Sequence, residues 1–522
     1  MPTRAPPVRF KIFANLYKDS VSLMQLGAKL RERQGVSEAS CIMATPANLA
    51  QLADAGLAIE ADASPSDLLV VVSGEQSACD EAIEAAGLLL RSSTASEGSA
   101  GEFHPPLSSL ALGIDRAAEA DLALISVPGD YAAAEAMKAL TLDLHVKLFS
   151  DNVSMAEERT IKRYARDRDL IVMGPDCGTA IVNGVPLGFA NVVRRGDIGL
   201  VAASGTGLQE VTCGIHHGGG GVSQALGTGG RDLHDEIGGI TMLQGLAALA
   251  ADARTRVIVL ISKPPAKDVA SKILELARTA GKPVVVHFLG ASPAEIQVAG
   301  LHACESLQHA AEVAVALSAG RAPPPKSTAP DVRKRSAIHH LARGMTHTQH
   351  AARGLYTGGT FCYEAQQLFI ERGLQVRSNA PVPRAQRLEG ERQGHIFIDM
   401  GDDDYTRGRP HPMIDPALRN EAIRTHAADA EVAAIVFDVV LGYGAHADPA
   451  AGLAAVLTES QRTASAQGRT IALIGHVCGT EGDPQQRDTQ VAKIEAAGAL
   501  VAGSNFQAIS LAADLVGHLA AR

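Results

Sequence analysis

Short apolar runs alternate with helix-like segments along most of the chain. In residues 8–90 the runs RFKIFANL, SEASCIMAT and DLLVVVSG are separated by segments whose apolar residues recur at helical spacing. We interpret residues 1–105 as a small N-terminal α+β domain. Residues 91–102 are rich in Ser and Gly, which predicts a linker or an ordered surface loop.

Continuous apolar runs in residues 106–195 predict parallel strands covered by helices on both faces. The runs are LALISVPG, VKLFSDN and LIVMGPDCG. We expect a Rossmann-like, CoA-binding-type domain, in which ligands bind beyond the carboxyl ends of the strands. Asn152 and Asp176 follow two of these runs and are therefore predicted to contact substrate.

Residues 196–320 and 353–522 repeat one order of strands and turns. VAASGTGLQEV, SQALGTGGRD, TRVIVLISKPP and KPVVVHFLG are matched in turn by GLYTGGTFCYEA, HIFIDMGDDD, VAAIVFDVVLGYG and GRTIALIGHVCG. Because the order is kept in all four places, we predict two duplicated flavodoxin-like domains. A Pro-rich, basic segment within residues 321–352 predicts the linker between the two copies.

Each copy has a turn of small residues between its first strand and first helix. Such a turn presents free N–H groups at the positive end of the helix, where phosphate or carboxylate binds. An ordinary tight turn with a hydroxyl cap is the alternative for one copy. Two copies favour a shared anion, because one helix terminus contributes at most about 1 to 2 kcal/mol. The predicted phosphate-binding residues are Ser204, Gly205, Thr206, Gly207, Gly358, Gly359 and Thr360.

The loop after the second strand of each copy carries charged residues. In the first copy Arg231 could donate to a ligand, or pair with Asp232 or Asp235 instead. In the second copy the aspartates that begin at Asp402 could hold magnesium, and the arginines of RGRPHP could bind a carboxylate or phosphate. A solvated acidic turn that neutralises these arginines is the alternative. This segment supplies the predicted catalytic residues, Arg407, Arg409 and His411.

Lys263 and Asp438 occupy equivalent strand ends in the two copies. Each could meet substrate or belong to a structural ion pair. The predicted substrate-binding residues are Asn152, Asp176, Gly229, Gly230, Arg231, Lys263, Asp402 and Asp438.

Charge and cysteine usage narrow the class of protein. The chain has 47 basic and 57 acidic residues and no basic run interleaved with aromatic residues, which argues against nucleic acid as a partner. No apolar run is long enough for a membrane span or a signal peptide, so a cytoplasmic protein is expected. Seven scattered cysteines indicate reduced thiols, without a disulfide framework or a metal site. Cys177 is expected to be a buried thiol, and His216 and His217 a helix end.

Several motifs together resemble the FdrA family over almost the whole chain. They include LALISVPGDYAAAEA, VMGPDCGTAIVNGVPLGFANV, ASGTGLQE, GTGGRDL, LYTGGTF, YTRGRPHPMIDPALRN and GTEGDPQQR. The resemblance implies a succinyl-CoA synthetase-like fold, in which SGTG is similar to the phosphate-binding turn of the synthetase α subunit. The duplicated tail resembles the carboxyl domain of the β subunit.

Three features depart from the synthetase pattern. His302 lies in AGLHACESL, where a synthetase has its phosphohistidine loop GHAGA. The amino-terminal unit lacks the glycine-rich CoA loop, and the units above leave no room for an ATP-grasp domain. These departures make a self-sufficient ATP-driven ligase an unsuitable model.

Members of the FdrA family resemble a subunit of the oxamate carbamoyltransferase of allantoin and purine degradation. The resemblance implies carbamoyl phosphate or another acyl phosphate as donor, an oxamate-like acid as acceptor, and further subunits as partners. Magnesium is the cofactor this hypothesis admits. Two alternatives stay open: an NDP-forming acyl-CoA synthetase, which would bind CoA and nucleotide, and a non-catalytic regulatory subunit.

Overall fold

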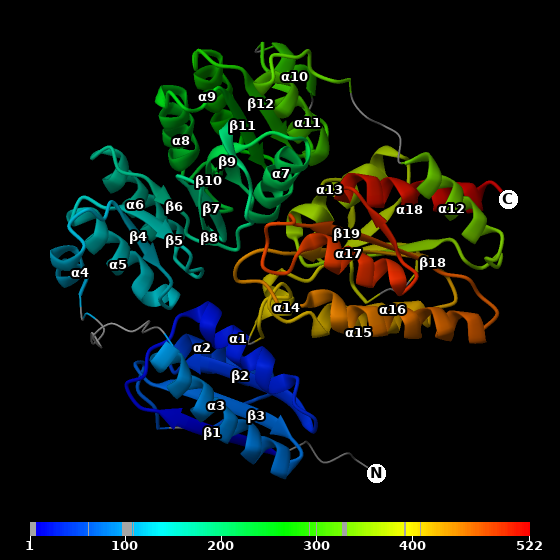
Figure 1. Cartoon of the computed structure of the whole chain (residues 1–522), viewed down its shortest axis with the longest axis horizontal. Coiled ribbons are helices and arrows are strands. Elements are labelled where there is room, and N and C mark those ends of the chain that lie inside the picture. Colours follow the sequence, from blue (N-terminus) through cyan, green and yellow to red (C-terminus); the bar gives the residue numbers. More distant parts are fainter. Residues whose placement is uncertain are drawn as a thin grey trace.

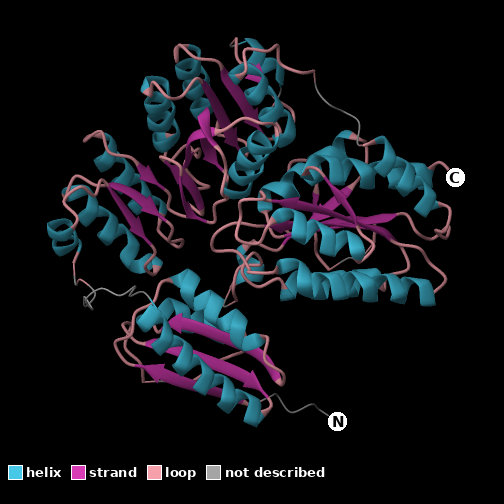
Figure 2. Cartoon of the chain, in the orientation of Figure 1, coloured by secondary structure: helices cyan, strands magenta, loops and turns pink. Residues whose placement is uncertain are grey.

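The computed structural model describes residues 7–522 except 61, 97–106, 108, 292, 299, 326–330, 391–392 and 408. In these residues four units follow one another along the chain, each with its own β-sheet (Figures 1 and 2). Residues 91–96 of the predicted linker continue a helix, and its residues 97–102 lie outside the described part. Within the described ranges, every helix is too short or too polar to cross a membrane.

The N-terminal unit is a small antiparallel sheet with helices packed on it. The strands β1 (Val8–Phe13), β2 (Val36–Met43) and β3 (Leu68–Gly74) lie in the order β1-β3-β2. The helices are α1 (Ser20–Arg31), α2 (Pro46–Asp54) and α3 (Gln76–Ser96). The β-branched run in β3 is fully buried, which explains why this strand is the central one.

The second unit is a parallel three-stranded sheet in the order β4-β5-β6. Its elements are α4 (Leu110–Arg116), β4 (Leu122–Ile125), α5 (Gly129–Thr141), β5 (His145–Leu148), α6 (Met155–Arg166) and β6 (Val172–Met173). A capping box formed by Ser154 and Glu157 fixes the start of α6. The parallel α/β prediction for this segment is confirmed.

A hairpin of β7 (Thr179–Val182) and β8 (Val185–Gly188) connects the second and third units. The sequence analysis placed it in the second unit, but β7 pairs with β10 of the following sheet. The predicted boundary at residue 195 coincides with the start of β9. The hairpin therefore extends the third sheet rather than the second.

The third unit is a seven-stranded sheet in the order β13-β12-β11-β9-β10-β7-β8. Its strands are β9 (Arg195–Ala203), β10 (Val222–Gly227), β11 (Val257–Ser262), β12 (Val284–Phe288) and β13 (His302–Ala303). Its helices are α7 (Gly205–His217), α8 (Ile240–Ala251), α9 (Lys267–Arg278), α10 (Pro293–Val298) and α11 (Leu307–Ser318).

The fourth unit is a seven-stranded sheet in the order β16-β15-β17-β14-β18-β19-β20. Its strands are β14 (Ala351–Tyr356), β15 (Val376–Ser378), β16 (Gln386–Arg387), β17 (His395–Asp399), β18 (Val432–Val440), β19 (Ala472–Cys478) and β20 (Leu500–Ala502). Its helices are α12 (Val332–Ala342), α13 (Gly359–Glu371), α14 (Asp403–Thr406), α15 (Ala417–Ala427), α16 (Pro449–Ala466), α17 (Arg487–Ala496) and α18 (Asn505–Ala520).

The third and fourth sheets share one strand order. The run β10-β9-β11-β12-β13 corresponds to β17-β14-β18-β19-β20, so the first strand of each copy lies between its second and third. This shared order supports the predicted duplication, which all four sequence echoes had indicated. The two sheets differ at the edge beyond this run, where the antiparallel hairpin β7-β8 extends the third sheet and the parallel strands β15 and β16 extend the fourth.

The predicted linker at residues 321–352 is wrong in its central part, because residues 332–342 form α12. Ile338 and Ala342 are fully buried and belong to the large core cluster. Helix α12 packs against α18. The Pro-rich composition ends before the helix begins, and the two apolar positions are enough to dock it.

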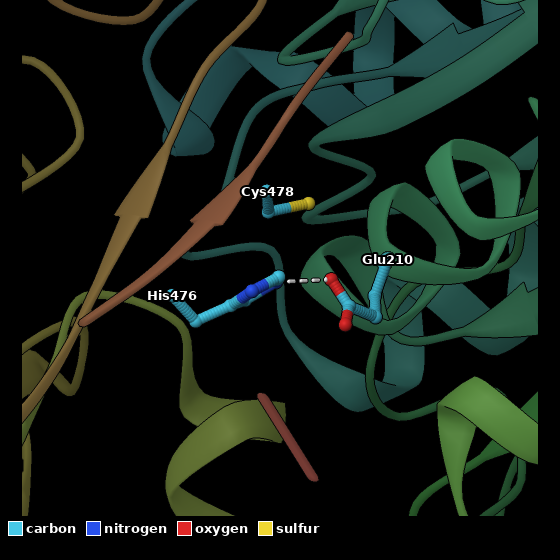
Figure 3. A group of neighbouring side chains, drawn as sticks. All are labelled: Glu210, His476 and Cys478. Carbon is cyan, nitrogen blue, oxygen red and sulfur yellow. Dashed lines mark hydrogen bonds and ion pairs between the residues drawn. The ribbon is translucent and has the colours of Figure 1, made fainter. Parts of the chain in front are cut away.

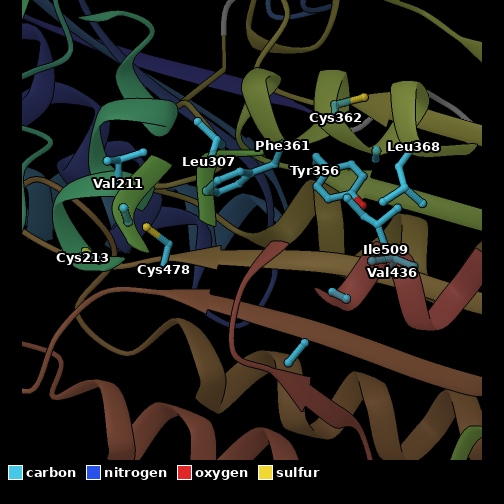
Figure 4. Packing of buried hydrophobic residues seen from close by; sticks show 14 of the residues in the cluster. Val211, Cys213, Leu307, Tyr356, Phe361, Cys362, Leu368, Val436, Cys478 and Ile509 are labelled. Atoms are coloured by element: carbon cyan, nitrogen blue, oxygen red, sulfur yellow. The ribbon is translucent and has the colours of Figure 1, made fainter. Parts of the chain in front are cut away.

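One continuous apolar core joins the two copies. Val211 of α7, Leu307 of α11, Phe361 of α13 and Ile509 of α18 all belong to it (Figure 4). The first helices of the two copies therefore pack directly against each other. This packing brings the two predicted phosphate turns into the same region.

A buried lysine ties the second unit to the third. Lys162 of α6 is fully buried and forms ion pairs with Glu158 at 2.9 Å and with Asp232 at 2.8 Å. Its ammonium also donates to the carbonyl of Thr228. Asp232 in turn accepts the N–H groups of Thr241 and Met242 at the start of α8.

We predict that Lys162→Met lowers the free energy of unfolding by about 3 to 5 kcal/mol, because it removes the cation of the buried Asp232 and leaves the buried Glu158 with Arg231 alone. Lys138→Met is the matched control, because Lys138 pairs with Glu135 on the surface of the same unit. Its loss should change stability by about 0 to 1 kcal/mol. Urea unfolding of the full chain measures both, and equal midpoints for the two variants would contradict the prediction.

Candidate functional site

The turns that begin α7 and α13 touch each other. The hydroxyls of Ser204 and Thr360 are 2.6 Å apart. A Cβ on Gly358 would lie 2.8 Å from the side-chain methyl of Thr206, so only glycine allows this approach. The positive ends of two helices therefore meet at one point, as the duplicated turns predicted.

A buried carboxylate holds the second turn in shape. Asp438 of β18 accepts the N–H and hydroxyl of Thr357 at 2.7 and 2.8 Å, and the N–H of Gly358 at 2.9 Å. Arg419 donates to its carbonyl at 2.7 Å. Asp438 is fully buried and does not line the cavity described next, so the structure gives it a bracing role rather than the predicted contact with substrate.

A cavity of about 800 Å³ opens at the joined turns. All four units contribute to its wall, and its size falls in the range of small-molecule sites. The sequence-predicted residues that line it are Asn152, Asp176, Ser204, Gly205, Thr206, Gly229, Gly230, Arg231, Lys263, Gly358, Gly359, Thr360, Arg409 and His411.

Three other predicted residues lie beside this wall rather than in it. Gly207 donates its N–H to Ser204, and Asp402 caps α14 by accepting the N–H of Asp404. Arg407 is exposed just after α14. The structure therefore assigns Gly207 and Asp402 to helix starts and leaves Arg407 without a place in the cavity.

Besides Lys18 of the N-terminal unit, three cationic side chains line the cavity in different ways. Arg231 is tied to α6, because it donates to the carbonyl of Val153 at 2.7 Å and pairs with Glu158 at 2.9 Å. Arg409 lies 3.9 Å from Glu38 of the N-terminal unit. Lys263 is exposed at the end of β11 and lowers the pKa values of the nearby cavity carboxyls.

Acidic side chains also line the cavity. The pKa of Asp176 is raised to about 6, first by the desolvating protein around it and then by the charges of Asp151 and Asp403, while Arg231 and Lys263 oppose the rise; the residue itself is exposed to the cavity. Burial also raises the pKa of Asp399 to about 6, against the influence of Lys263 and of the N–H of Gly401. Carboxyls that titrate near neutral pH can exchange protons with a ligand.

Asp399 lies directly at the start of α13. A Cβ on Gly359 would be 2.5 Å from its Oδ2, while its Oδ1 accepts the N–H of Gly401 at 2.9 Å. An ionised Asp399 would repel an anion at this helix end, but in its protonated form it would donate a hydrogen bond to that anion. Its raised pKa makes the second state accessible near neutral pH.

His411 presents a neutral imidazole to the cavity. Its Nδ1 accepts the N–H of Met413 at 3.2 Å, which leaves the proton on Nε2. Burial lowers its pKa to about 4. The ring of Phe189 lies 6.0 Å away, and Phe149 lies beyond it at 5.6 Å from Phe189. His411 can therefore act as a neutral donor beside an aromatic wall.

The sequence analysis missed the contribution of the N-terminal unit. Lys18, Met24, Asn48 and other residues of that unit line the cavity. The unit is held there by Arg31, which pairs with Asp415, and by the hydroxyl of Tyr17, which donates to the carbonyl of Ser126 at 3.1 Å. Such contacts between distant units leave no periodic signal in the sequence.

The structure also locates the two adjacent histidines, Cys177 and His302. His217 is the last residue of α7, with Gly218 as its C-cap, and His216 pairs with Glu481 at 2.7 Å. Cys177 is a buried thiol. His302 is in β13, outside the residues that line the cavity.

One group of side chains of the metal-ligating type, which the sequence analysis did not anticipate, occurs among the described residues. Glu210, His476 and Cys478 place one donor atom each within 4.8 Å of one another (Figure 3). Burial opposes a charge on His476, but the Glu210 carboxylate outweighs it and raises the pKa of His476 to about 10. Glu210 and His476 are 266 positions apart, so their spacing in the sequence gave no sign of this group.

Three family models match separate parts of the chain. Residues 6–105 match the "AllF, heavy metal-associated domain", residues 193–290 the "CoA binding domain", and residues 355–515 the "CoA-ligase". The CoA-binding match covers the third unit, and not residues 106–195, for which the sequence suggested a CoA-binding type. With the parallel sheets and the joined turns, these matches define a CoA-ligase-like α/β protein.

A relative of similar length places the chain more narrowly. The protein YahF of Escherichia coli K12 is 40% identical over 513 residues, which cover 98% of each chain. The chain therefore belongs to the same family as YahF.

More distant relatives are ligases. The α subunit of succinate–CoA ligase from Staphylococcus epidermidis is 26% identical over 150 residues, which cover 28% of this chain and 48% of that subunit. A dinucleotide-forming acetyl-coenzyme A synthetase of Ca. Korarchaeum cryptofilum covers 77% of this chain and 83% of its own at 15% identity and a TM-score of 0.33, too low to carry an argument. The sequence matches favour the ligase alternative over the carbamoyltransferase hypothesis.

The raised pKa of Asp399 predicts a pH-dependent stability. A carboxyl whose pKa is higher in the folded state stabilises that state at low pH, and the contribution is lost as the pH rises through about 6. The melting temperature of Asp399→Asn, relative to that of the native chain, should therefore rise as the pH is raised from 5 to 7. Asp404→Asn, at an exposed position on α14, is the control. A difference between Asp399→Asn and native chain that stays constant with pH would contradict the assignment.

Proposed function

We propose that this chain binds an acyl phosphate, with its phosphoryl group at the joined starts of α7 and α13, and transfers the acyl group in the manner of a CoA ligase. The observation that carries the proposal is the 2.6 Å contact between Ser204 and Thr360, which sets two helix N-termini at one point of the cavity. The matches to the CoA-binding and CoA-ligase models support the class of chemistry.

The leaving phosphate is the part of the reaction that this geometry serves. When a nucleophile attacks the acyl carbon, a new bond to that carbon forms. The bond between the acyl carbon and the oxygen that bridges it to phosphorus breaks, and phosphate departs with the electron pair of that bond. N–H groups at two helix ends would stabilise that charge, and Lys263 would add a cation. A protonated Asp399 would donate to the same group.

The attacking group must lose a proton, and the acidic wall offers a base for it. Asp176 lies at the carboxyl end of the second sheet, and its pKa of about 6 leaves it ionised at neutral pH. His411 would donate from Nε2 to the acyl oxygen, because its Nδ1 is already an acceptor. The base thus comes from the second unit and the donor from the fourth, and both line the cavity.

The thiol of CoA is the first candidate acceptor, because one of the three family models describes a CoA-ligase and another a CoA-binding domain. The strand orders of the four described sheets account for the described residues without an ATP-grasp fold. His302 does not line the cavity. We therefore propose that the acyl phosphate reaches the cavity ready-made, from another subunit or from solution.

Carbamoyl phosphate with an oxamate-like acid is the second candidate pair. The observation that favours it is the position of His302, because a transferase that uses a ready-made acyl phosphate needs no phosphohistidine. Arg231 and Arg409, which line the cavity, would bind the carboxylate of such an acid. The match of the N-terminal unit to the AllF model is consistent with this pair.

We predict that Gly205→Asp weakens the binding of inorganic phosphate about tenfold or more, because a carboxylate at the first position of α7 repels the anion. The same carboxylate favours the helix itself, so the fold should persist. Thermal stabilisation by phosphate measures the binding. Gly205→Ala is the matched control, because its Cβ would meet Thr179 at an ordinary 3.6 Å.

Phosphate release distinguishes the acceptors. The native chain should release phosphate from acetyl phosphate with CoA, or from carbamoyl phosphate with oxamate, and Gly205→Asp should lower that rate at least tenfold while Gly205→Ala keeps it. Release with CoA alone selects the ligase, and release with oxamate alone selects the carbamoyltransferase. Phosphate binding without release from either donor, with partner subunits present, would leave the regulatory alternative and sink the proposed activity.

A further inference from the structure

A buried cluster of metal-type donors lies one helical turn below the first phosphate turn. Glu210 comes from α7, and His476 and Cys478 come from β19 of the other copy (Figure 3). Their exposed fractions are 6%, 3% and 1%. The carboxylate of Glu210 and Nε2 of His476 are 2.7 Å apart.

A second thiol lies beside this group. Cys213 is one turn further along α7 than Glu210 and interacts with Cys478, but it is not one of the three residues whose donor atoms all lie within 4.8 Å of one another. Both thiols are buried and outside any disulfide (Figure 4). Three donors therefore lie close enough to share one ion, and a shift of the Cys213 side chain would supply the fourth ligand of a closed tetrahedral zinc site.

The duplication supplies an internal comparison for this cluster. The residues equivalent to Glu210 and His476 are Glu364 of α13 and His287 of β12, but Gln367 and Leu289 stand in place of the two cysteines. Glu364 accepts instead from the N–H of Leu307 at 3.1 Å and from the side-chain amide of Asn505 at 2.8 Å. His287 bonds the carbonyl of Cys304 at 2.8 Å.

The two copies thus share the carboxylate and the imidazole, while the thiol of Cys213 occurs only in the first copy and that of Cys478 only in the second. Shared positions are expected from the packing of the duplicated fold. The thiols are an addition: Cys478 meets the shared pair, and Cys213 lies beside Cys478. A packing role alone would be met by apolar side chains such as Leu289, which is fully buried at the equivalent place.

We propose that Glu210, Cys213, His476 and Cys478 bind one divalent cation of the zinc class. Thiolate and imidazole are the ligands that select zinc over magnesium or calcium. Glu210 keeps a second anchor, because its Oε1 accepts the N–H of Asn505 at 3.3 Å while Oε2 faces the cluster. The cation would take the position of the proton that now joins Glu210 and His476.

Such a cation would be structural rather than catalytic. Its four ligands leave no open position for substrate, and none of them lines the cavity. It would crosslink α7 of one copy to β19 of the other, four residues beyond Thr206. It would therefore fix the pair of helix starts that meet at Ser204 and Thr360.

Cobalt substitution of the full-length chain tests the proposal. After treatment with a chelator, the chain should take up one equivalent of Co²⁺ and show thiolate-to-cobalt charge transfer with intense tetrahedral visible bands. With Zn²⁺, X-ray absorption should give two sulfur neighbours at about 2.3 Å and two lighter neighbours at about 2.0 to 2.2 Å. A native chain without cobalt–thiolate bands overturns the proposal, whatever the variants do.

Single substitutions assign the ligands. Cys213→Ser and Cys478→Ser should each weaken the charge-transfer band and lower the affinity for Co²⁺ at least tenfold. Cys79→Ser is the matched control, because Cys79 is an equally buried thiol of α3 in the N-terminal unit. Bands that survive both cluster substitutions, or that disappear in Cys79→Ser, would assign the metal elsewhere and reject the site. Because Cys213 and Cys478 lie outside the cavity, phosphate binding by the native chain is a separate readout.

Discussion

The contact between two helix starts is the constraint on which the rest of the structure depends. Ser204 and Thr360 meet at 2.6 Å only because Gly358 has no side chain to collide with Thr206. Two aligned helix dipoles that point at one place repel each other, so something must hold them together. The shared apolar core of the two copies does so from below, through α7, α11, α13 and α18.

Buried charges fix the surroundings of that contact. Asp438 satisfies the donors of the second turn, which would otherwise point into a core without partners. Lys162 and Asp232 attach the second sheet to the third, and so carry the strand ends with Asp176 toward the turns. Burying charged side chains costs desolvation free energy. Our hypothesis is that the Asp438 group and the Lys162–Asp232 group are retained because they specify a single arrangement of the units.

The sequence predicted what depends on local pattern and repetition. The α/β class, the parallel sheets and the two copies follow from apolar runs and from four echoes in constant order, and the structure has them. The paired turns followed from the same repetition. The helix at 332–342 was missed because its apolar contribution is two positions, Ile338 and Ala342, within a segment that begins Pro-rich.

Contacts across long separations could not be predicted in the same way. Lys18 and Asn48 line the cavity only because the N-terminal unit docks against the other units. Glu210 meets His476 only because the two copies dock against each other. The role of Asp438 was equally hard to predict. A carboxylate at the end of a strand can contact substrate or hold a neighbouring turn, and the sequence is the same in both cases. Only the direction of its side chain, toward Thr357 and Gly358, separates the two roles.

The charge distribution of the cavity restricts what can bind there. Helix starts and Lys263 line it together with Asp151, Asp176 and Asp403, and Lys263 acts on the carboxyl of Asp176. A ligand that carries negative charge alone would be repelled by these carboxylates. A ligand with an anionic phosphoryl end and a neutral or proton-donating end meets both kinds of group, because its second end can give a proton to a carboxylate of raised pKa. The mixed lining therefore favours an acyl phosphate together with an acceptor that can give up a proton.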